Sequence, residues 1–347
     1  MTNTHRSSLP LRKLGRTALM PTVLGFGGAP LGDLFQTLTE PGADAVVREA
    51  LDQGITLFDT APWYGHGLSE HRLGRGLWHV ERSGIVVSTK VGRVYHRPTD
   101  LRGFSTKPWA GGLPFQLQFD YSGAGVRRSY EDSLLRLGLN RVDCLVIHDL
   151  DGIYHQGEQL QRHRAALEAS GWAELEQLRG SGEITAIGAG INNSSDMRYF
   201  LDHFDLDFFL VAMPYTLLDQ KPLRDELPEC LRRGIGIVIG SPYASGILAT
   251  GPIPGAVYNY AAAPPEIIDK TRRILEACNE YGVSLQAAAL QFPLAHPSIA
   301  AVIPGATSHE MVAANAANLR VPIPQELWST LKKRDLILPD APVPAGV

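Results

Sequence analysis

Asp59, Lys90 and His148 each end a short apolar segment, and Tyr64 follows Asp59 by five residues. If the three segments are neighbouring parallel strands, their last residues lie around one rim of the sheet, where Tyr64 can fold back over them. A carboxylate, an ammonium, an imidazole and a phenol within reach of one another are suited to general acid–base catalysis. These residues therefore predict a site in which a proton moves to or from an oxygen atom of a small molecule.

A phenol exchanges its proton poorly near neutral pH, because its ordinary pKa is ~10. Lowering the pKa of Tyr64 to ~7 takes about 4 kcal/mol, which one ammonium at about 4 Å supplies in an effective dielectric of ~20. We expect Lys90 to provide this field and Asp59 to keep Lys90 charged and oriented. We expect His148 to hydrogen-bond the reacting oxygen. Each residue alone has an ordinary structural explanation, but their joint occurrence favours catalysis.

The elements that must position these residues form a repeating pattern, in which short β-branched runs alternate with amphipathic segments. Runs that are apolar throughout are typical of a parallel sheet covered on both faces. Eight repeats favour an α/β fold of the closed (β/α)8 TIM-barrel type over an open sheet. The predicted strands are Val23–Phe26, Thr56–Asp59, Ile85–Lys90, Val142–His148, Ile184–Ala189, Phe208–Met213, Gly236–Gly240 and Ile299–Ile303.

Additional segments lie outside the repeat. Leu9–Leu14 and Leu19–Val23 flank a turn signal and predict a short N-terminal hairpin before the first strand. Residues 91–121 and 241–264 predict long loops on the C-terminal face, where barrel enzymes have their active sites. We find no linker or break in composition, so we interpret residues 1–347 as a single domain.

The composition excludes several classes of protein. The chain of 347 residues is 44% hydrophobic and 20% charged, as is ordinary for a globular protein, and its net charge of −4 argues against a nucleic acid partner. Cys144, Cys230 and Cys278 form no CxxC pair, so we predict reduced thiols and no metal site. The N-terminal segment lacks the apolar core of a signal peptide, and no apolar run approaches the ~18 residues of a spanning helix. We expect a cytoplasmic protein without a membrane partner, and we make no prediction of its oligomeric state.

The stretches FDTAPWYG, VVSTK and VIHD resemble the signatures of the aldo-keto reductase family. The resemblance extends from LGRTALMPTVLGFGGAPLG to VIPGATSHEMVAANAAN and so covers nearly the whole chain. It implies that Asp59, Tyr64, Lys90 and His148 form the catalytic tetrad. It also implies a nicotinamide cofactor that lies extended across the barrel mouth without a Rossmann fold, and no GxGxxG motif follows the first strand.

The resemblance implies cofactor contacts as well, with two departures from the family pattern. Where many members have a glutamine on the sixth strand and a stacking tyrosine after the seventh, this chain has Ala212 and Gly240. We therefore expect another ring, Tyr215 or Tyr243, to replace the stacking contact. The candidate cofactor-binding residues are Asn192, Asn193, Ser241, Pro242, Tyr243, Ser245, Gly246, Gly305, Thr307 and Asn315.

The segment after the last strand bears on the choice between NAD and NADP. Family members that prefer NADPH often have a lysine or arginine there to pair with the 2′-phosphate. Residues 303–311 contain neither and include Glu310. A phosphate without a cationic partner loses its strongest hydrogen bonds. We therefore predict NAD as the preferred cofactor, with NADP as the alternative, and we expect oxidation to be the cellular direction.

The stretches Phe119–Ser129 and Val146–Asp151 are most similar to the sugar dehydrogenases of the family, the D-threo-aldose and L-fucose 1-dehydrogenases. This implies oxidation of an aldose such as L-fucose, L-galactose or D-arabinose at C1 to the lactone, with Tyr64 taking the hydroxyl proton. Polyol recognition needs hydrogen-bonding groups beside an apolar platform. The loop residues that offer both are Trp63, Trp109, Tyr121, Tyr154 and His155.

Two other functions stay open. Pyridoxal 4-dehydrogenase is a close relative of these sugar dehydrogenases, and an aromatic alcohol would use the same tetrad in a flatter pocket. Some proteins of this kind are regulatory subunits that sense the nicotinamide redox state, and an intact tetrad is compatible with that role. Rapid turnover of a small substrate would argue against a sensor.

Overall fold

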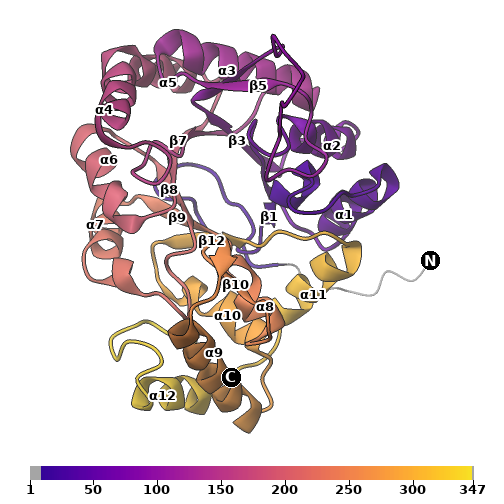
Figure 1. Cartoon of the computed structure of the whole chain (residues 1–347). Coiled ribbons are helices and arrows are strands. Elements are labelled where there is room, and N and C mark those ends of the chain that lie inside the picture. The colour runs from indigo at the N-terminus through magenta and orange to yellow at the C-terminus, as the bar shows by residue number, and fades with distance from the viewer. Residues whose placement is uncertain (1–8, 346–347) are drawn as a thin grey trace.

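The computed structural model describes residues 9–345, and within them eight parallel strands form a barrel (Figure 1). Each strand pairs with the next in the order β1-β2-β3-β6-β7-β8-β9-β12. Parallel bridges from Leu24 to Val302 and from Gly27 to Gly305 join the first strand to the last and close the barrel. The predicted fold is confirmed. The strands are β1 (Phe26–Gly27), β2 (Leu57–Asp59), β3 (Val86–Val91), β6 (Cys144–His148), β7 (Ala186–Ile191), β8 (Phe208–Ala212), β9 (Gly236–Gly240) and β12 (Ile299–Ile303).

The N-terminal hairpin is also present and closes the N-terminal end of the barrel. Leu11 pairs with Thr22 in an antiparallel bridge, and the Leu14 amide donates to the Leu19 carbonyl at 3.0 Å. Leu14 packs into the cluster of side chains that fills the barrel interior. Burial of such side chains is the main favourable contribution to folding. The other members are Leu57, Val86, Cys144, Val146, Ala186, Phe208, Leu210, Val238, Ala300, Ala301 and Ile303.

Helices surround the barrel and cover the outer faces of its strands (Figure 1). Most of them bury one side of an amphipathic sequence, and N-cap side chains such as Ser122 and Ser308 fix where some of them begin. The helices are α1 (Glu40–Asp52), α2 (Leu68–Leu77), α3 (Gly123–Leu137), α4 (Gly157–Ala166), α5 (Trp172–Gly180), α6 (Met197–His203), α7 (Glu226–Arg233), α8 (Ile247–Thr250), α9 (Pro265–Glu280), α10 (Leu285–Gln291), α11 (His309–Leu319) and α12 (Gln325–Lys333).

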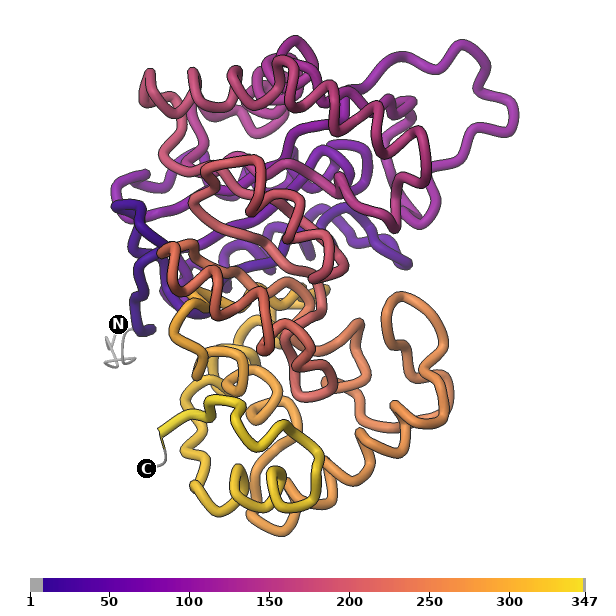
Figure 2. The backbone as a smooth tube through the Cα atoms, turned by 90° about the vertical axis from the view of Figure 1, so that its left-hand side faces the viewer, coloured from indigo at the N-terminus to yellow at the C-terminus, as the bar shows by residue number. Residues whose placement is uncertain are grey.

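The two long predicted loops contain hairpins that the sequence did not reveal. In the first loop β4 (Arg93–His96) pairs antiparallel with β5 (Gln116–Phe119). In the second, β10 (Val257–Tyr258) pairs with β11 (Ala261–Ala262). Figure 2 shows both loops projecting on the same side of the barrel, the first in purple and the second in orange. They therefore flank the C-terminal ends of the strands.

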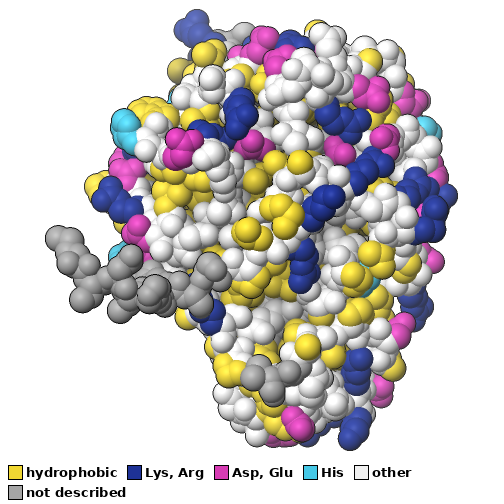
Figure 3. Space-filling model, turned by 180° about the vertical axis from the view of Figure 1, so that it is seen from behind, with side chains coloured by type: hydrophobic (Ala, Val, Ile, Leu, Met, Phe, Trp, Pro, Cys, Tyr) yellow, Lys and Arg dark blue, Asp and Glu magenta, His cyan; other side chains and the backbone are white. Residues whose placement is uncertain are grey.

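The structure also shows features related to membrane insertion, metal binding and surface charge. Within residues 9–345, no helix is long and apolar enough to cross a membrane, and no group of three or more His, Cys, Asp or Glu side chains is placed to hold a metal ion. The three cysteines are buried. On the face shown in Figure 3, basic and acidic side chains are interspersed, without a field of one sign.

Candidate active site

Asp59 and Lys90 form a buried ion pair at the C-terminal ends of β2 and β3. Lys90 Nζ lies 2.6 Å from Asp59 Oδ2 and donates to the Thr60 carbonyl at 2.8 Å. Ser88 pairs with Asp59 in the sheet register, and its hydroxyl donates to Asp59 Oδ1 at 2.9 Å. The side chains of both charged residues are at most 3% exposed. Asp59 is therefore placed where it can orient Lys90, as the sequence led us to expect.

Tyr64 reaches the same rim from the turn that follows β2. Its ring centroid lies 4.5 Å from Lys90 Nζ and 6.0 Å from the His148 ring, to which it is nearly perpendicular. The turn depends on Gly65, which has a φ of +66° and whose missing Cβ would lie 2.5 Å from the Gly32 carbonyl oxygen. The structure thus brings all four predicted catalytic residues together.

The expectation that the pKa of Tyr64 is lowered is wrong for the protein without a bound cofactor. Burial, followed by the negative charge of Asp59, raises the pKa of Tyr64 well above its ordinary value. Asp59, 2.6 Å from Lys90, compensates the positive charge that was expected to lower this pKa. Burial likewise lowers the pKa of Lys90 and raises that of Asp59. Tyr64 is therefore a protonated hydrogen-bond donor at neutral pH, suited to act as an acid.

His148 ends β6, and Tyr121 Oη donates to its carbonyl oxygen at 2.7 Å. Burial, together with the positive charges of Arg93 and Lys90, lowers the pKa of His148 well below its ordinary value. The imidazole is therefore neutral. Its Nε2 lies 3.3 Å from Asp149 Oδ2, a contact that the sequence reasoning missed.

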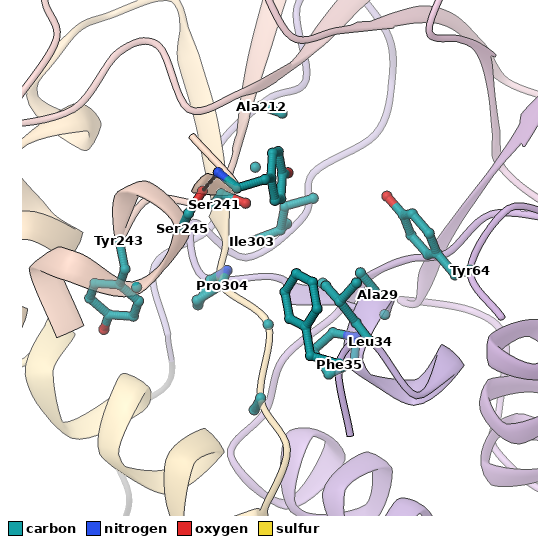
Figure 4. Close-up of a pocket in the computed structure, with 18 of the residues that line it drawn as sticks. Ala29, Leu34, Phe35, Tyr64, Ala212, Ser241, Tyr243, Ser245, Ile303 and Pro304 are labelled. Carbon is teal, nitrogen blue, oxygen red and sulfur yellow. Dashed lines mark hydrogen bonds between the residues drawn. The ribbon is translucent and has the colours of Figure 1, made fainter. Parts of the chain in front are cut away.

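A cavity of about 520 Å³ lies at this end of the barrel. Its volume falls in the range of roughly 300–1,000 Å³ that is common for small-molecule sites. In Figure 4 it extends from Tyr64 on one side to Ser241, Ser245 and Tyr243 on the other. The predicted site residues that line it are Asp59, Trp63, Tyr64, Trp109, Tyr154, Ser241, Pro242, Tyr243, Ser245, Gly246, Gly305 and Thr307.

The remaining predicted cofactor residues have partners elsewhere. Asn192 Nδ2 donates to Asp149 and Asp151, and Asn193 Oδ1 accepts from the Ser195 amide. Neither asparagine is among the residues that line the cavity.

The remaining candidates for the stacking ring and for substrate contacts do not line the cavity. Tyr215, one candidate for the stacking ring, is fully buried against Phe292. The substrate candidates Tyr121 and His155 are buried and lie within hydrogen-bonding distance of each other, at 3.1 Å.

The structure adds residues that sequence reasoning missed. Leu34 and Phe35, in the loop after β1, form part of the cavity wall below Tyr64 in Figure 4. Tyr260, at the tip of the β10–β11 hairpin, lines the cavity too, and its amide donates to Ser245 Oγ at 3.1 Å. The position of all these residues after barrel strands was the available signal, because active sites of such barrels are built from those loops.

The far end of the cavity has features that fit a dinucleotide. Thr307 and Met311 line it beside the N-terminus of α11, where backbone amides favour a phosphate. Gly27 and Gly305 lie at strand ends that pack closely against neighbouring residues. A Cβ on Gly305, for example, would lie 2.8 Å from Pro30. Tyr243 Oη donates to Asn315 Oδ1 at 2.7 Å, which fixes the ring in the cavity wall. Asn315 thus supports the site from behind.

An eight-stranded α/β barrel with this tetrad beside a large cavity defines an oxidoreductase of the kind that acts on CH–OH groups. Residues 23–335 match the model of the aldo/keto reductase family, and the chain belongs to that family. Aldo-keto reductases use nicotinamide cofactors.

Named relatives support the same assignment. Pyridoxal 4-dehydrogenase of Microbacterium luteolum is 39% identical over 341 residues, which cover 96% of this chain and 99% of that protein. D-threo-aldose 1-dehydrogenase of a Pseudomonas species is 36% identical over 333 residues, covering 90% of this chain and 94% of that protein. A solved aldo-keto reductase from Bacillus halodurans, in its holo form, matches with a TM-score of 0.72 at 25% identity and covers 94% of this chain and 96% of that chain.

Proposed function

We propose that this protein is an NAD-dependent dehydrogenase that oxidises an aldose at C1 to the lactone. The observation that carries the proposal is that Tyr64 and several aromatic side chains line the same cavity. The Trp109 ring lies 5.7 Å from the Tyr64 ring and 5.5 Å from the Trp63 ring, and Tyr154 lines the same cavity. Aromatic faces beside a hydrogen-bonding group suit a small ring that carries a hydroxyl.

The reaction removes a hydride from C1 and a proton from its hydroxyl. A nicotinamide bound in the cavity would supply the acceptor for that hydride. Tyr64 would first release its own proton to solvent, and the substrate hydroxyl proton would then pass to the Tyr64 oxygen, with Lys90 Nζ 4.5 Å from the centre of the ring. His148 donates a hydrogen bond from Nε2 to the C1 oxygen. In the reverse direction the protonated Tyr64 is ready to act as the acid.

The lining of the cavity supports NAD over NADP. Among the residues of the described chain that line the cavity, none is lysine or arginine. The first turn of α11 instead contains Glu310, an exposed carboxylate. The 2′-phosphate of NADP would approach this end without a cationic partner and close to a negative charge, which weakens its binding.

Pyridoxal is the second candidate substrate, and the flat aromatic walls around Tyr64 favour it. Pyridoxal and an aldose share one chemical feature, because each closes into a cyclic hemiacetal that gives a lactone on two-electron oxidation. The named relatives act on members of both groups. The same tetrad and the same proton path would serve either ring.

The test follows NADH formation with L-fucose, L-galactose, D-arabinose and pyridoxal as substrates, and it identifies the lactone by mass spectrometry. We expect turnover of the sugars that Tyr64→Phe reduces by more than about 10³-fold. Tyr95→Phe is the matched control, because Tyr95 donates to the Pro62 carbonyl and does not line the cavity. Turnover of pyridoxal but of none of the sugars would make pyridoxal the substrate and leave the proposed mechanism unchanged. NADH binding without turnover of any ring would favour the sensor.

A further inference from the structure

Asp149 lies between the catalytic histidine and a buried arginine. Its Oδ2 accepts from Arg93 Nη2 at 2.7 Å and lies 3.3 Å from His148 Nε2. Its Oδ1 accepts from Asn192 Nδ2 at 2.9 Å. The Arg93 side chain is 1% exposed and that of Asp149 is 8% exposed. Both carboxylate oxygens are therefore held, and one of them faces the imidazole.

The backbone at Asp149 is fixed as firmly as the side chain. Asp149 has a φ of +51°, in the left-handed region that non-glycine residues rarely adopt. Its amide donates to the Gly190 carbonyl at 3.0 Å, which ties the residue to the adjoining strand β7. Left-handed residues of this kind cluster at functional sites, where the surroundings fix them.

The contact determines where His148 has its proton. A carboxylate only accepts hydrogen bonds, so the imidazole nitrogen 3.3 Å from it is the one on which a proton is favoured. The imidazole is neutral and has one N–H, and this contact favours Nε2 for it. Nδ1, the other ring nitrogen, is buried and has no hydrogen-bond partner within the described residues. The protonated nitrogen is the one that the reaction requires for the substrate oxygen.

We propose that Asp149 is a positioning residue, which fixes the proton of His148 on Nε2 and holds this N–H in place until the substrate oxygen accepts it. Arg93 and Asn192 hold the carboxylate in this orientation and oppose the rise in its pKa that burial causes. The proposal depends on the proposed role of His148 and names the group that prepares it. A buried carboxylate also orients a catalytic imidazole in other enzymes, there through the ring nitrogen that does not react, whereas Asp149 faces the nitrogen proposed to contact the substrate.

Arg93 extends this support to the wall of the cavity. Its guanidinium carbon lies 5.4 Å from the Trp63 ring centroid and 5.2 Å from that of Tyr154, and both rings line the cavity. Nε and Nη1 of Arg93 have no hydrogen-bond partner within the described residues, so ring faces are their neighbours. One cation thus holds Asp149 and two substrate-facing rings in a single arrangement.

The test uses a double variant, Arg93→Met/Asp149→Ala, because removing Asp149 alone would leave a buried cation unpaired. The matched control is Arg82→Met/Asp143→Ala, which removes another arginine–carboxylate pair, 3.0 Å apart, at the opposite end of β6. Nitrogen-15 NMR reports the imidazole N–H of His148, identified by its loss in His148→Gln. Steady-state kinetics report kcat and KM.

We expect the wild type and the control to show a hydrogen-bonded Nε2–H that exchanges slowly with water, and the Arg93/Asp149 variant to lose it. We expect kcat to fall on the order of 10²-fold, with an unchanged dissociation constant for NADH. A persisting signal, or a kcat within threefold of the wild type, would overturn the proposal. If His148→Gln retains full turnover, the proposed catalytic role of His148 fails instead, and the NMR result still tests Asp149.

Discussion

Replacing Lys90 with methionine should destabilise the protein by about 3–5 kcal/mol. Lys90 Nζ and Asp59 Oδ2 are 2.6 Å apart. Their attraction is about 6 kcal/mol in an effective dielectric of ~20. Burial opposes both charges, so the pair contributes little net stability, but removing one partner leaves a carboxylate whose side chain is 3% exposed. Lys90→Met/Asp59→Asn removes both charges and should recover most of the loss.

The assay is urea or thermal unfolding of the two variants at several pH values. The loss in Lys90→Met corresponds to a decrease in Tm on the order of 5–10 °C. Burial already raises the pKa of Asp59 in the wild type, and the loss of Lys90 raises it further. A raised folded-state pKa means that stability falls as pH rises above the unfolded value of ~4. The defect should therefore shrink in acid, and the double variant should lack this pH dependence. A Lys90→Met variant as stable as the wild type, or a double variant no more stable than the single one, would refute the reasoning.

Three further predictions concern other parts of the site. Because burial and Asp59 raise the pKa of Tyr64, kcat for oxidation should still increase at pH ~10, and a pH profile that levels off near neutrality would contradict this. Burial and the neighbouring His163 lower the pKa of His155 from 6.5 to about 4. As the pH drops between these two values, the unfolded chain takes up a proton before the folded protein does, so stability falls. Urea unfolding of His155→Gln should show a weaker pH dependence of stability in this range. Met311→Arg adds a cation beside α11 and should lower the KM for NADP about tenfold, whereas Glu310→Gln should change it less.

Most of the fold could be predicted because each barrel strand is an apolar run bounded by turn residues. The boundaries differ where pairing, not hydrophobicity, decides them. The fifth barrel strand, β7, covers Ala186–Ile191 instead of Ile184–Ala189, because His148 and Phe208 pair with its later residues. The first strand begins at Phe26 because the preceding residues make only isolated bridges. Such choices depend on the partner strand, which lies far away in the sequence.

The two hairpins on the C-terminal face could not be predicted for a related reason. The strands β4 and β5 are separated by a long irregular segment, so no short turn signal joins them. The shorter hairpin has a local signal in Asn259, which with Tyr260 adopts positive φ values at the turn. Tyr260 enters the cavity only because this turn folds back over the barrel mouth. A single tyrosine in a loop sequence contains no information about that direction.

The four residues predicted for catalysis lie together as expected, but the charge balance between them differs from the prediction. A pairwise estimate gives Lys90 enough field to lower the pKa of Tyr64. In the structure Asp59 compensates that field at 2.6 Å, and burial adds a penalty for any phenolate. The same holds for His148, whose neighbour Asp149 is adjacent in sequence but meets Nε2 only because of its left-handed backbone. The protein alone therefore holds Tyr64 in its protonated form. In the proposed mechanism oxidation begins with the loss of the tyrosine proton, so the pH profile of oxidation is the measurement that connects this electrostatic arrangement to turnover.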